Sequence, residues 1–238
     1  MIGIDVGTSG VRCIAKNGAA EVAAQSGVQM AGHGADGRSP ETWRRAATAA
    51  LHLLLKQVDA KSVRALAVDG TSGTMLPVDK DGAPLAPGMM YSDAVSDTEI
   101  LASIAAAAPA GSAARGATSG LAKAMVFLDL TGLAGVVHQA DWIAGMLSGR
   151  FDISDENNAL KTGYDPVRRQ WPEWISLSGM NIGLLPKVVP PGSKTGKIDK
   201  KAAETFGFSC DAIIVAGTTD GCASFLATGA GEPGEGGG

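Results

Sequence analysis

Three short motifs in the sequence combine an acidic side chain with glycines and hydroxyl groups. The first, Asp5-Val6-Gly7-Thr8-Ser9-Gly10, follows an apolar run at the start of the chain. Glycines let backbone N–H groups approach phosphate oxygens, hydroxyls donate further hydrogen bonds, and a carboxylate can hold Mg²⁺. An ordinary hairpin turn uses the same residue types. The motif thus predicts either a phosphate-binding turn or a simple strand connection, and the candidate ligands are Asp5, Gly7, Thr8 and Ser9.

The second motif places Asp220 directly after Gly217-Thr218-Thr219, where a predicted strand gives way to a helix. A carboxylate at this position can cap the helix or interact with its dipole, which contributes about 0.3–1 kcal/mol. It can also act as a general base on a substrate hydroxyl, a role that contributes about 10²–10⁴ in rate. Both interpretations of Asp220 stay open at this point.

A third group of short polar side chains is suited to binding the many hydroxyls of a sugar, although each residue alone is typical of a turn. The group consists of Asp69, Thr71, Ser72 and Asp93. We expect a second polar set to lie in a solvated loop, namely Asn157, Asn158, Lys161 and Tyr164. The three histidines have no spacing typical of metal ligands, so we assign them neither a metal nor a nucleophilic role.

Two familiar nucleotide-binding motifs are absent from the sequence. The segment 192–197 resembles a Walker loop, but it is one residue short between its glycines, and Ile198 stands where Ser or Thr is required. Gly229, Gly231 and Gly234 fit the pattern GxGxxG, but no strand precedes them and Pro233 interrupts them. Neither segment therefore predicts a nucleotide site.

The elements that would position the motifs begin with strands. Residues 1–6, 11–15 and 21–30 predict a three-stranded antiparallel meander, because apolar runs alternate with turn residues. Ser39 and Pro40 then predict the start of a helix that reaches about Val58. A buried strand over residues 63–68 follows, and we expect residues 74–78 to continue the same sheet.

The second half of the chain is expected to be mainly helical from about 95 to 174. A helix over 199–206, a strand over 212–216 and a helix over 220–228 complete the prediction. An apolar strand followed by an acid and a Gly-Thr motif thus occurs at three places. We expect the three turns to converge at one edge of a sheet, where the sites of α/β proteins normally lie.

Composition narrows the class of protein. The chain has 238 residues and a net charge of −4, with no run of five like charges, which argues against nucleic acid as a partner. The longest nearly apolar stretch, 46–55, is too short to span a bilayer, and no signal peptide is evident at the N-terminus. Because Cys13, Cys210 and Cys222 lack metal or disulfide spacing, we expect reduced, mostly buried thiols and a cytoplasmic protein.

Taken together, three segments resemble the FGGY family of carbohydrate kinases, in the actin-like ATPase superfamily: 4–9, 191–197 and 216–220. The resemblance covers nearly the whole chain and corresponds to the first of that family's two domains. A narrower resemblance points to the D-ribulose kinase branch and is carried by segments 68–74, 139–142 and 158–164, together with 216–220 and 225–227. Xylulose-type kinases usually have a Met-His pair where Thr71-Ser72 stand.

The resemblance implies a ribonuclease H-like α/β domain over residues 1–228, with a mixed central sheet and a helical insert at about 95–190. It also implies ATP with Mg²⁺ as cofactors and a pentulose, D-ribulose first, as the sugar substrate. Asp220 matches the family's catalytic base, and Asp5 with the turn at 7–9 matches its first phosphate loop, near Mg²⁺. The sugar would then meet Asp69, Thr71, Ser72, Asp93 and Asp220.

The sequence departs from the family pattern in two ways. Ala94-Val95 follows Asp93, so the Arg that often stands near this acid is missing. Residues 229–238 read as a Gly-rich linker, and the family's C-terminal ATP-binding domain is expected to be absent, so the chain alone should be weakly active or inactive. Three alternatives stay open: a xylulose kinase, a kinase for another polyol, and a non-catalytic sugar-binding module. A homodimer is also conceivable.

Overall fold

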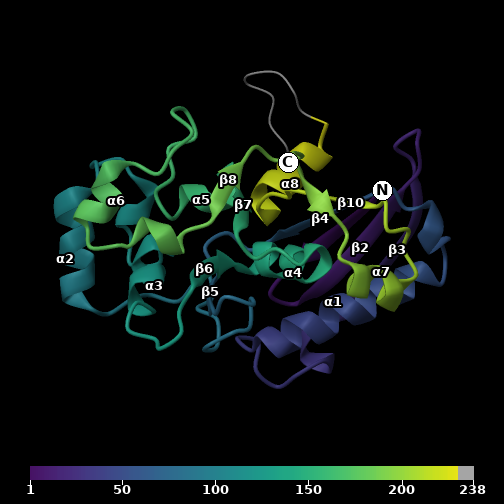
Figure 1. Cartoon of the computed structure of the whole chain (residues 1–238), viewed down its shortest axis with the longest axis horizontal. Helices are drawn as coiled ribbons and strands as arrows, with labels where there is room; N and C mark the ends of the chain where they lie inside the picture. The colour runs from purple at the N-terminus through teal and green to yellow at the C-terminus, as the bar shows by residue number, and fades with distance from the viewer. Residues whose placement is uncertain (230–238) are drawn as a thin grey trace.

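The computed structural model describes residues 1–229. Apart from Gly229, the predicted Gly-rich linker therefore lies outside the described residues. A six-stranded mixed sheet with the order β3-β2-β1-β4-β10-β9 forms the centre of one lobe (Figure 1). β1 (Ile2–Val6), β2 (Gly10–Lys16) and β3 (Val22–Gln29) form the predicted antiparallel meander. β4 (Ala65–Gly70) and β10 (Ile213–Val215) run parallel to β1. The α/β fold with a mixed sheet is therefore confirmed.

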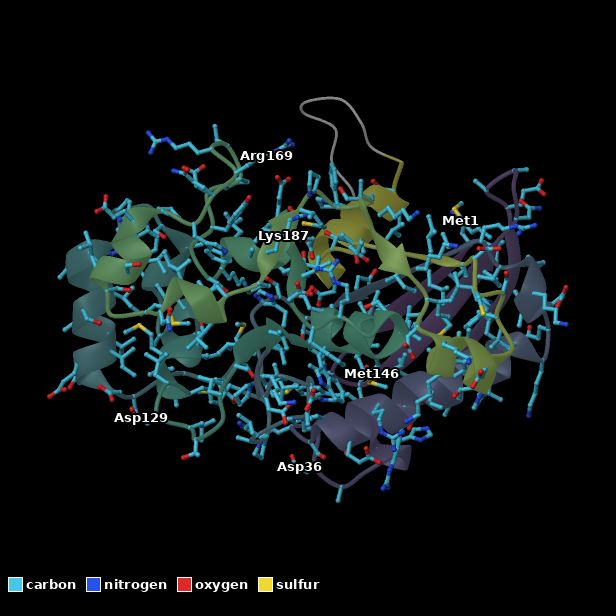
Figure 2. The ribbon with its side chains drawn as sticks, viewed as in Figure 1. Met1, Asp36, Asp129, Met146, Arg169 and Lys187 are labelled. Atoms are coloured by element: carbon cyan, nitrogen blue, oxygen red, sulfur yellow. The ribbon has the colours of Figure 1, made fainter. Side chains whose placement is uncertain are left out.

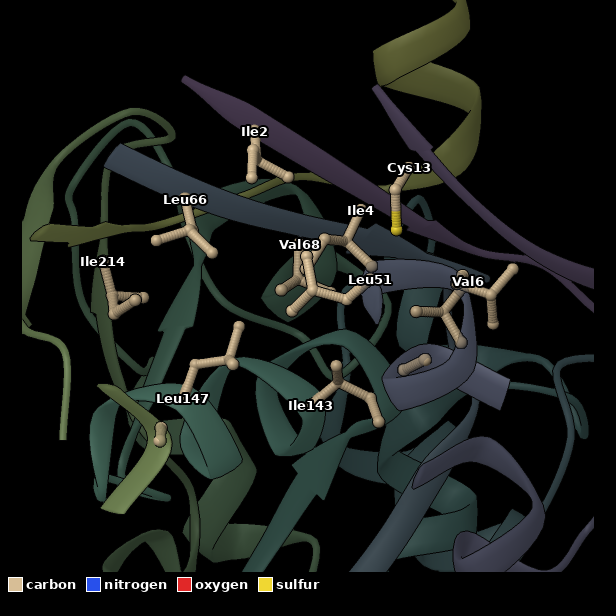
Figure 3. Packing of buried hydrophobic residues seen from close by; sticks show 14 of the residues in the cluster. Ile2, Ile4, Val6, Cys13, Leu51, Leu66, Val68, Ile143, Leu147 and Ile214 are labelled. Carbon is tan, nitrogen blue, oxygen red and sulfur yellow. The ribbon is translucent and has the colours of Figure 1, made fainter. Parts of the chain in front are cut away.

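Two helices cover one face of this sheet. α1 (Pro40–Leu55) packs on β2 and β3, while α4 (Gln139–Ser148) packs on β4. Side chains alternate along a strand, so Ile2, Ile4 and Val6 point into this core while Gly3 and Asp5 lie on the other face. Figure 3 shows apolar side chains of β1 and β4 meeting those of α1 and α4. This packing fixes the strands whose ends carry the acidic motifs.

The helix predicted from Ser39 is confirmed, although it ends at Leu55 rather than near Val58. Ser39 occupies the N-cap position without a side-chain capping hydrogen bond, and Pro40 is the first helical residue. Trp43 is completely buried and meets Trp142 of α4 edge to face, with ring centroids 6.4 Å apart. This aromatic contact joins the two helices beneath the sheet.

The prediction that residues 74–78 continue the central sheet is wrong. β5 (Met75–Val78) pairs instead with β6 (Gly135–His138) in a separate antiparallel pair. β4 is already paired with β1 on one side and with β10 on the other. The strand that follows β4 in the chain therefore cannot pair with it. The two strands belong to a second lobe, whose own apolar core includes α2 (Thr98–Ala107), α3 (Gly120–Val126) and α6 (Glu173–Leu177).

The helical insert predicted at about 95–190 contains strands as well as helices. It contains a parallel pair of short strands, β7 (Ile153–Asp155) and β8 (Lys187–Val189), and the short helix α5 (Glu156–Leu160). α4 interrupts the insert, because it returns to the central sheet and joins the first core. Residues 1–229 also contain four 3₁₀ turns, two in the first lobe and two in this region: Met30–Gly32, Ala60–Ser62, Ala113–Arg115 and Ile182–Leu184.

The end of the described chain returns to the central sheet. α7 (Lys200–Phe206), β10 and α8 (Asp220–Ala227) confirm the predicted helix, strand and helix. The prediction missed β9 (Lys194–Lys197), an edge strand with two lysines and a glycine instead of an apolar pattern. Within residues 1–229, no helix has the length and apolar character needed to cross a bilayer. All three cysteines are free, but Cys210 is exposed, contrary to the expected burial.

Candidate active site

Three carboxylates converge at one edge of the central sheet. β1, β4 and β10 are adjacent and parallel, so their carboxyl ends share this edge. Asp5 and Asp69 stand directly opposite each other in the register of β1 and β4. Beyond them, Gly70 forms a bridge with Thr219, the residue that precedes Asp220. The predicted convergence of the three motifs is therefore confirmed, whereas the roles of the individual residues stay predictions.

The carboxylates at this edge influence one another's protonation. Burial raises the pKa of Asp5, an effect that Arg12, at 3.6 Å from the carboxylate, partly offsets. Burial, together with the neighbouring charges of Asp5 and Asp220, raises the pKa of Asp69 to about 7. The Oδ1 atom of Asp69 is also buried without a hydrogen-bond partner in the described part of the chain. Such an edge favours the binding of a cation.

The donor set suits Mg²⁺ bound in part through water. Mg²⁺ prefers oxygen ligands, keeps several waters and is usually held by one or two carboxylates plus substrate phosphates. Asp5 supplies such a carboxylate, and the unpaired Oδ1 of Asp69, opposite Asp5 in the strand register, is an orphaned acceptor beside it. Residues 1–229 contain no group of three or more side chains that could hold a metal by themselves. The ion would therefore depend on phosphate oxygens for its remaining ligands.

The turn between β1 and β2 is narrow and open to solvent. Gly7 N donates to Gly10 O at 3.0 Å, which closes the turn, and both Thr8 and Ser9 are exposed. A Cβ atom at Gly10 would lie 2.2 Å from the carbonyl oxygen of Val28, so glycine is required for this approach to β3. A groove of about 540 Å³ runs beside the turn and is lined by Gly7, Ser9, Gly10 and Arg12, among others. Because Gly7 N is engaged within the turn, the exposed hydroxyls of Thr8 and Ser9 are the groups here that a phosphate could reach.

Asp220 is the first residue of α8, and it is not the helix cap. Thr219 holds the N-cap position, and its Oγ1 accepts a hydrogen bond from Cys222 N at 3.4 Å. The capping interpretation of Asp220 is therefore wrong. Asp220 is half-buried, and its Oδ1 accepts a hydrogen bond from the adjacent Gly221 N at 2.7 Å. The Oδ1 contact leaves the other carboxylate oxygen of Asp220 able to accept a hydrogen bond from a ligand.

The loop that carries Asp220 is held from both sides. A Cβ atom at Gly217 would lie 1.7 Å from Val68 O, so only glycine allows this loop to press against β4. From α5, Asn157 Nδ2 donates to Thr218 Oγ1 at 2.8 Å and Asn158 Nδ2 donates to Thr218 O at 3.2 Å. These contacts fix the loop relative to the ends of β4 and α5.

The expectation of a solvated loop over 157–164 is wrong. Asn157 and Asn158 belong to α5, and both Asn158 and Tyr164 are buried. Asp155 caps this helix and also accepts from Asn158 Nδ2 at 2.6 Å. The sequence does contain a signal for the helix, because Asp155 is a typical N-cap residue, but the burial depends on the packing of the two lobes.

The predicted sugar-binding residues are in part engaged with the protein. Thr71 is buried, and its Oγ1 lies 2.6 Å from Thr74 Oγ1 and 3.1 Å from the side-chain amide of Gln139. Ser72 lies next to it and is half-buried, as is Asp69. The structure thus brings Asp69, Thr71 and Ser72 together at the sheet edge, but Thr71 orders the loop rather than facing solvent.

Asp93 lies farther along the chain and forms a bidentate ion pair. Arg38 donates from Nη2 to Asp93 Oδ1 at 2.8 Å and from Nη1 to Oδ2, while Met90 N also donates to Oδ2 at 2.7 Å. Asp93 thus pairs with an arginine from the loop before α1, although none stands beside Asp93 in the sequence. No sequence signal connects these two residues, which are 55 positions apart.

Lys123 is a completely buried cation beside the same loop, and no local sequence pattern predicts its burial. Its Nζ donates to the carbonyl oxygens of Gly73 at 2.8 Å and Tyr91 at 3.1 Å. Burial lowers the pKa of Lys123 to about 8; the nearby charge of Lys161 acts in the same direction, and Asp93 opposes it. The unfolded chain keeps this proton up to about pH 10.4.

We expect Lys123 to make the protein more stable as the pH rises from about 8 toward 10. In this range the unfolded state binds more protons than the folded state, so the free energy of unfolding increases with pH. Urea unfolding at several pH values should show this increase for the wild type and a smaller one for Lys123→Met. Lys187→Met, which removes an exposed lysine on β8 (Figure 2), is the control. Identical pH dependence in wild type and Lys123→Met would contradict the prediction.

A second buried polar group joins the two lobes. His138 Nδ1 lies 2.8 Å from Asp141 Oδ2 and 3.2 Å from Ser154 Oγ, and Nε2 lies 3.3 Å from Thr162 Oγ1. Each of these residues is buried. The cluster connects β6, α4, β7 and the segment after α5, so it helps to set the position of α5 against the site. The three-residue spacing between His138 and Asp141 is a sequence signal that is compatible with this contact.

Comparison with known proteins agrees with this geometry. Residues 1–107 match the model of the FGGY family of carbohydrate kinases, N-terminal domain. The chain is 33% identical to the autoinducer-2 kinase of Yersinia enterocolitica over 98 aligned residues. These residues make up 40% of this chain and 18% of that protein. The chain covers about half or less of the length of the relatives that it matches.

Solved structures share the fold over almost the whole chain. The xylulose kinase from Rhodospirillum rubrum superposes with a TM-score of 0.83 at 24% identity, covering 98% of this chain and 51% of that one. The gluconate kinase from Lactobacillus acidophilus superposes with a TM-score of 0.77 at 17% identity, covering 96% of this chain and 49% of that one. Residues 1–107 are therefore similar to the N-terminal domain of the FGGY family of carbohydrate kinases, and the described chain shares its fold with about half of each of these solved kinases.

Proposed function

We propose that this chain is the sugar-binding half of an ATP-dependent carbohydrate kinase that phosphorylates a ketopentose, with D-ribulose as the first candidate. The observation that carries the proposal is the meeting of Asp5, Asp69 and Asp220 at the ends of three adjacent parallel strands. A sugar hydroxyl and a phosphate can be brought together at this edge. The similar proteins support the reaction class, because they are an autoinducer-2 kinase, a xylulose kinase and a gluconate kinase.

The residues would divide the work between the sugar and the phosphate. Asp220 accepts the proton of the attacking hydroxyl, which makes its oxygen a better nucleophile toward the γ-phosphate. The turn over residues 7–9 binds phosphate oxygens, and Asp5 holds Mg²⁺, which neutralises phosphate charge when bound. Asp69 and Ser72 bind sugar hydroxyls. Phosphoryl transfer depends mainly on such positioning and electrostatic stabilisation.

A second domain would close the ATP site from the other side. Solved kinases with this fold are about twice as long as the chain, since it covers 51% of one of them. We propose that a domain of this kind, in the same protein or in a partner, supplies the remaining contacts to ATP. The cytoplasm is the compartment that we propose, because ATP is available there.

The substrate can be tested with this chain alone. A ligand at 100 times its dissociation constant stabilises the folded state by about 2.7 kcal/mol, so the true sugar should raise the melting temperature clearly. We expect D-ribulose to give a larger shift than D-xylulose, D-gluconate and glycerol. A larger shift with another sugar would reassign the substrate, and no shift with any of them would argue against a sugar site.

A non-catalytic sugar-binding module is the second candidate. It shares the sugar site but not the phosphoryl transfer, so the two differ in sugar-dependent ADP formation. We expect ADP to form with D-ribulose when a second domain completes the ATP site. Sugar binding without ADP formation in the completed protein would favour the module.

A further inference from the structure

Asp155 is a buried carboxylate on which three hydrogen bonds converge. It is the last residue of β7 and is only 2% exposed. Its Oδ1 accepts from Asn157 N at 2.8 Å and from Asn158 N at 3.1 Å, which caps α5. Its Oδ2 accepts from Asn158 Nδ2 at 2.6 Å. One carboxylate therefore orients the first turn of α5 and one of its side-chain amides.

The same two asparagines of α5 bond Thr218, which lies two residues before Asp220 at the start of α8 (Figure 1). Asn157 Nδ2 donates to Thr218 Oγ1 at 2.8 Å, and Asn158 Nδ2 donates to Thr218 O at 3.2 Å. The Nδ2 atom of Asn158 thus lies between two acceptors and uses both of its hydrogens. Asn158 Oδ1 is buried without a hydrogen-bond partner among the described residues, which is a costly arrangement. The orientation of this amide is therefore set by Asp155 and Thr218.

Thr218 and Asp220 are joined by a single residue that is itself held in place. Thr219 is 5% exposed, forms a bridge with Gly70 at the end of β4, and caps α8 by accepting from Cys222 N at 3.4 Å. Thr218 is also buried, at 8% exposure. A displacement of Thr218 would therefore move the start of α8, and Asp220 with it. Misplacing a reacting group by about 1 Å can cost about 10²-fold in rate.

We propose that Asp155 is a positioning residue for the proposed base: its carboxylate holds the asparagines of α5, and through Thr218 these keep Asp220 in place for the substrate hydroxyl. The proposal rests on the proposed function, because it takes Asp220 as the base. All three partners of Asp155 are N–H donors, and an ionised carboxylate satisfies them at once. Burial and the charge of Asp141 raise the pKa of Asp155, and the hydrogen bonds from Asn158 oppose them.

Asp155→Asn breaks this link while it keeps the helix cap. Asparagine caps helices as well as aspartate does, but its NH₂ group would face the NH₂ group of Asn158. Hydrogen exchange of this chain alone reports the result at the amides of Cys222 and Ala223, which bond Thr219. We expect exchange of these amides to become about 10-fold faster, the lower end of the range for loss of a hydrogen bond to a charged group.

Asp199→Asn is the matched control, because Asp199 caps α7 in the same way, by accepting from Lys201 N at 2.9 Å and Ala202 N at 3.4 Å. It should leave hydrogen exchange at the start of α8 unchanged. Thermal unfolding establishes that each variant is folded. If Asp155→Asn does not fold, Asn157→Ala serves in the same comparison, since it removes one bond to the loop before α8 and keeps the cap of α5.

Turnover distinguishes positioning from general stability. With a second domain completing the ATP site, Asp155→Asn should reduce the rate of D-ribulose-dependent ADP formation by about 10- to 100-fold. The dissociation constant of D-ribulose should change far less. In the Asp220→Asn background the same substitution should have little further effect, because the group that it positions is already lost. Asp199→Asn should leave both quantities unchanged.

Three results would overturn the role of Asp155 and leave the kinase proposal intact. They are unchanged exchange at the start of α8, unchanged turnover, and a loss of turnover that adds in full to that of Asp220→Asn. If the wild type with a second domain forms no ADP with any of the sugars tested, the proposed function fails, and the role of Asp155 fails with it.

Discussion

Asp220→Asn should reduce turnover of the sugar kinase by about 10²–10⁴-fold, the range for loss of a general base. The substitution keeps the size of the side chain but removes its ability to accept the proton of the attacking hydroxyl. The helix cap should survive, because Thr219 and not Asp220 bonds the first turn of α8. The measurement is the steady-state rate of D-ribulose-dependent ADP formation, with a second domain completing the ATP site.

Sugar affinity separates a catalytic role of Asp220 from a structural one. We expect the dissociation constant of D-ribulose, measured by titration, to change far less than the turnover. Asp81→Asn is a matched control, since Asp81 lies in an exposed turn and pairs only with the neighbouring Lys80. If Asp220→Asn turned over at the wild-type rate, another group would have to accept the proton.

Gly217→Ala should destabilise the protein by about 1–3 kcal/mol or more, the usual cost of forcing extra volume into a packed site. The added Cβ would lie 1.7 Å from Val68 O, and backbone atoms of β4 cannot move aside without breaking the sheet. The alternative for the chain is to displace the loop that carries Asp220. We therefore expect lower turnover as well as a lower free energy of unfolding.

Gly221→Ala is the matched control for this substitution, because it adds the same methyl group four residues later in the same segment. A Cβ at Gly221 meets no atom within 4 Å, and alanine is favoured over glycine inside a helix by about 1 kcal/mol. Urea unfolding should therefore show a loss for Gly217→Ala and no loss for Gly221→Ala. Equal stability of the two variants would show that the loop at Gly217 can shift without cost.

A polar network around α5 holds one side of the candidate site. Thr218 is bonded through both its hydroxyl and its carbonyl oxygen by Asn157 and Asn158. Asp155 in turn orients Asn158 and caps the helix. Held in this way, the loop keeps Asp220 at the end of β10 before any ligand binds, which reduces the cost of ordering it during the reaction.

The sequence alone determined the elements around the central sheet and the place of the acidic motifs. Local signals were sufficient for this, because alternating apolar residues, turn glycines and the Pro40 helix start act over a few neighbouring positions. Placing Asp5 and Asp220 at one edge also followed from the sequence, since parallel strands have their carboxyl ends on the same side. The resemblance to a family of carbohydrate kinases was visible in the same motifs.

The set of polar residues around the site depends on tertiary packing and not on local sequence patterns. β5 left the central sheet because β4 already had two neighbours, a fact of topology that no local pattern contains. Arg38 reached Asp93 across 55 positions, and Lys123 became buried against Gly73, through packing between distant segments. Burial and charge pairing depend on how separate elements meet in space, and for that reason the contacts of Asn158 and Lys161 could not be predicted from their places in the chain.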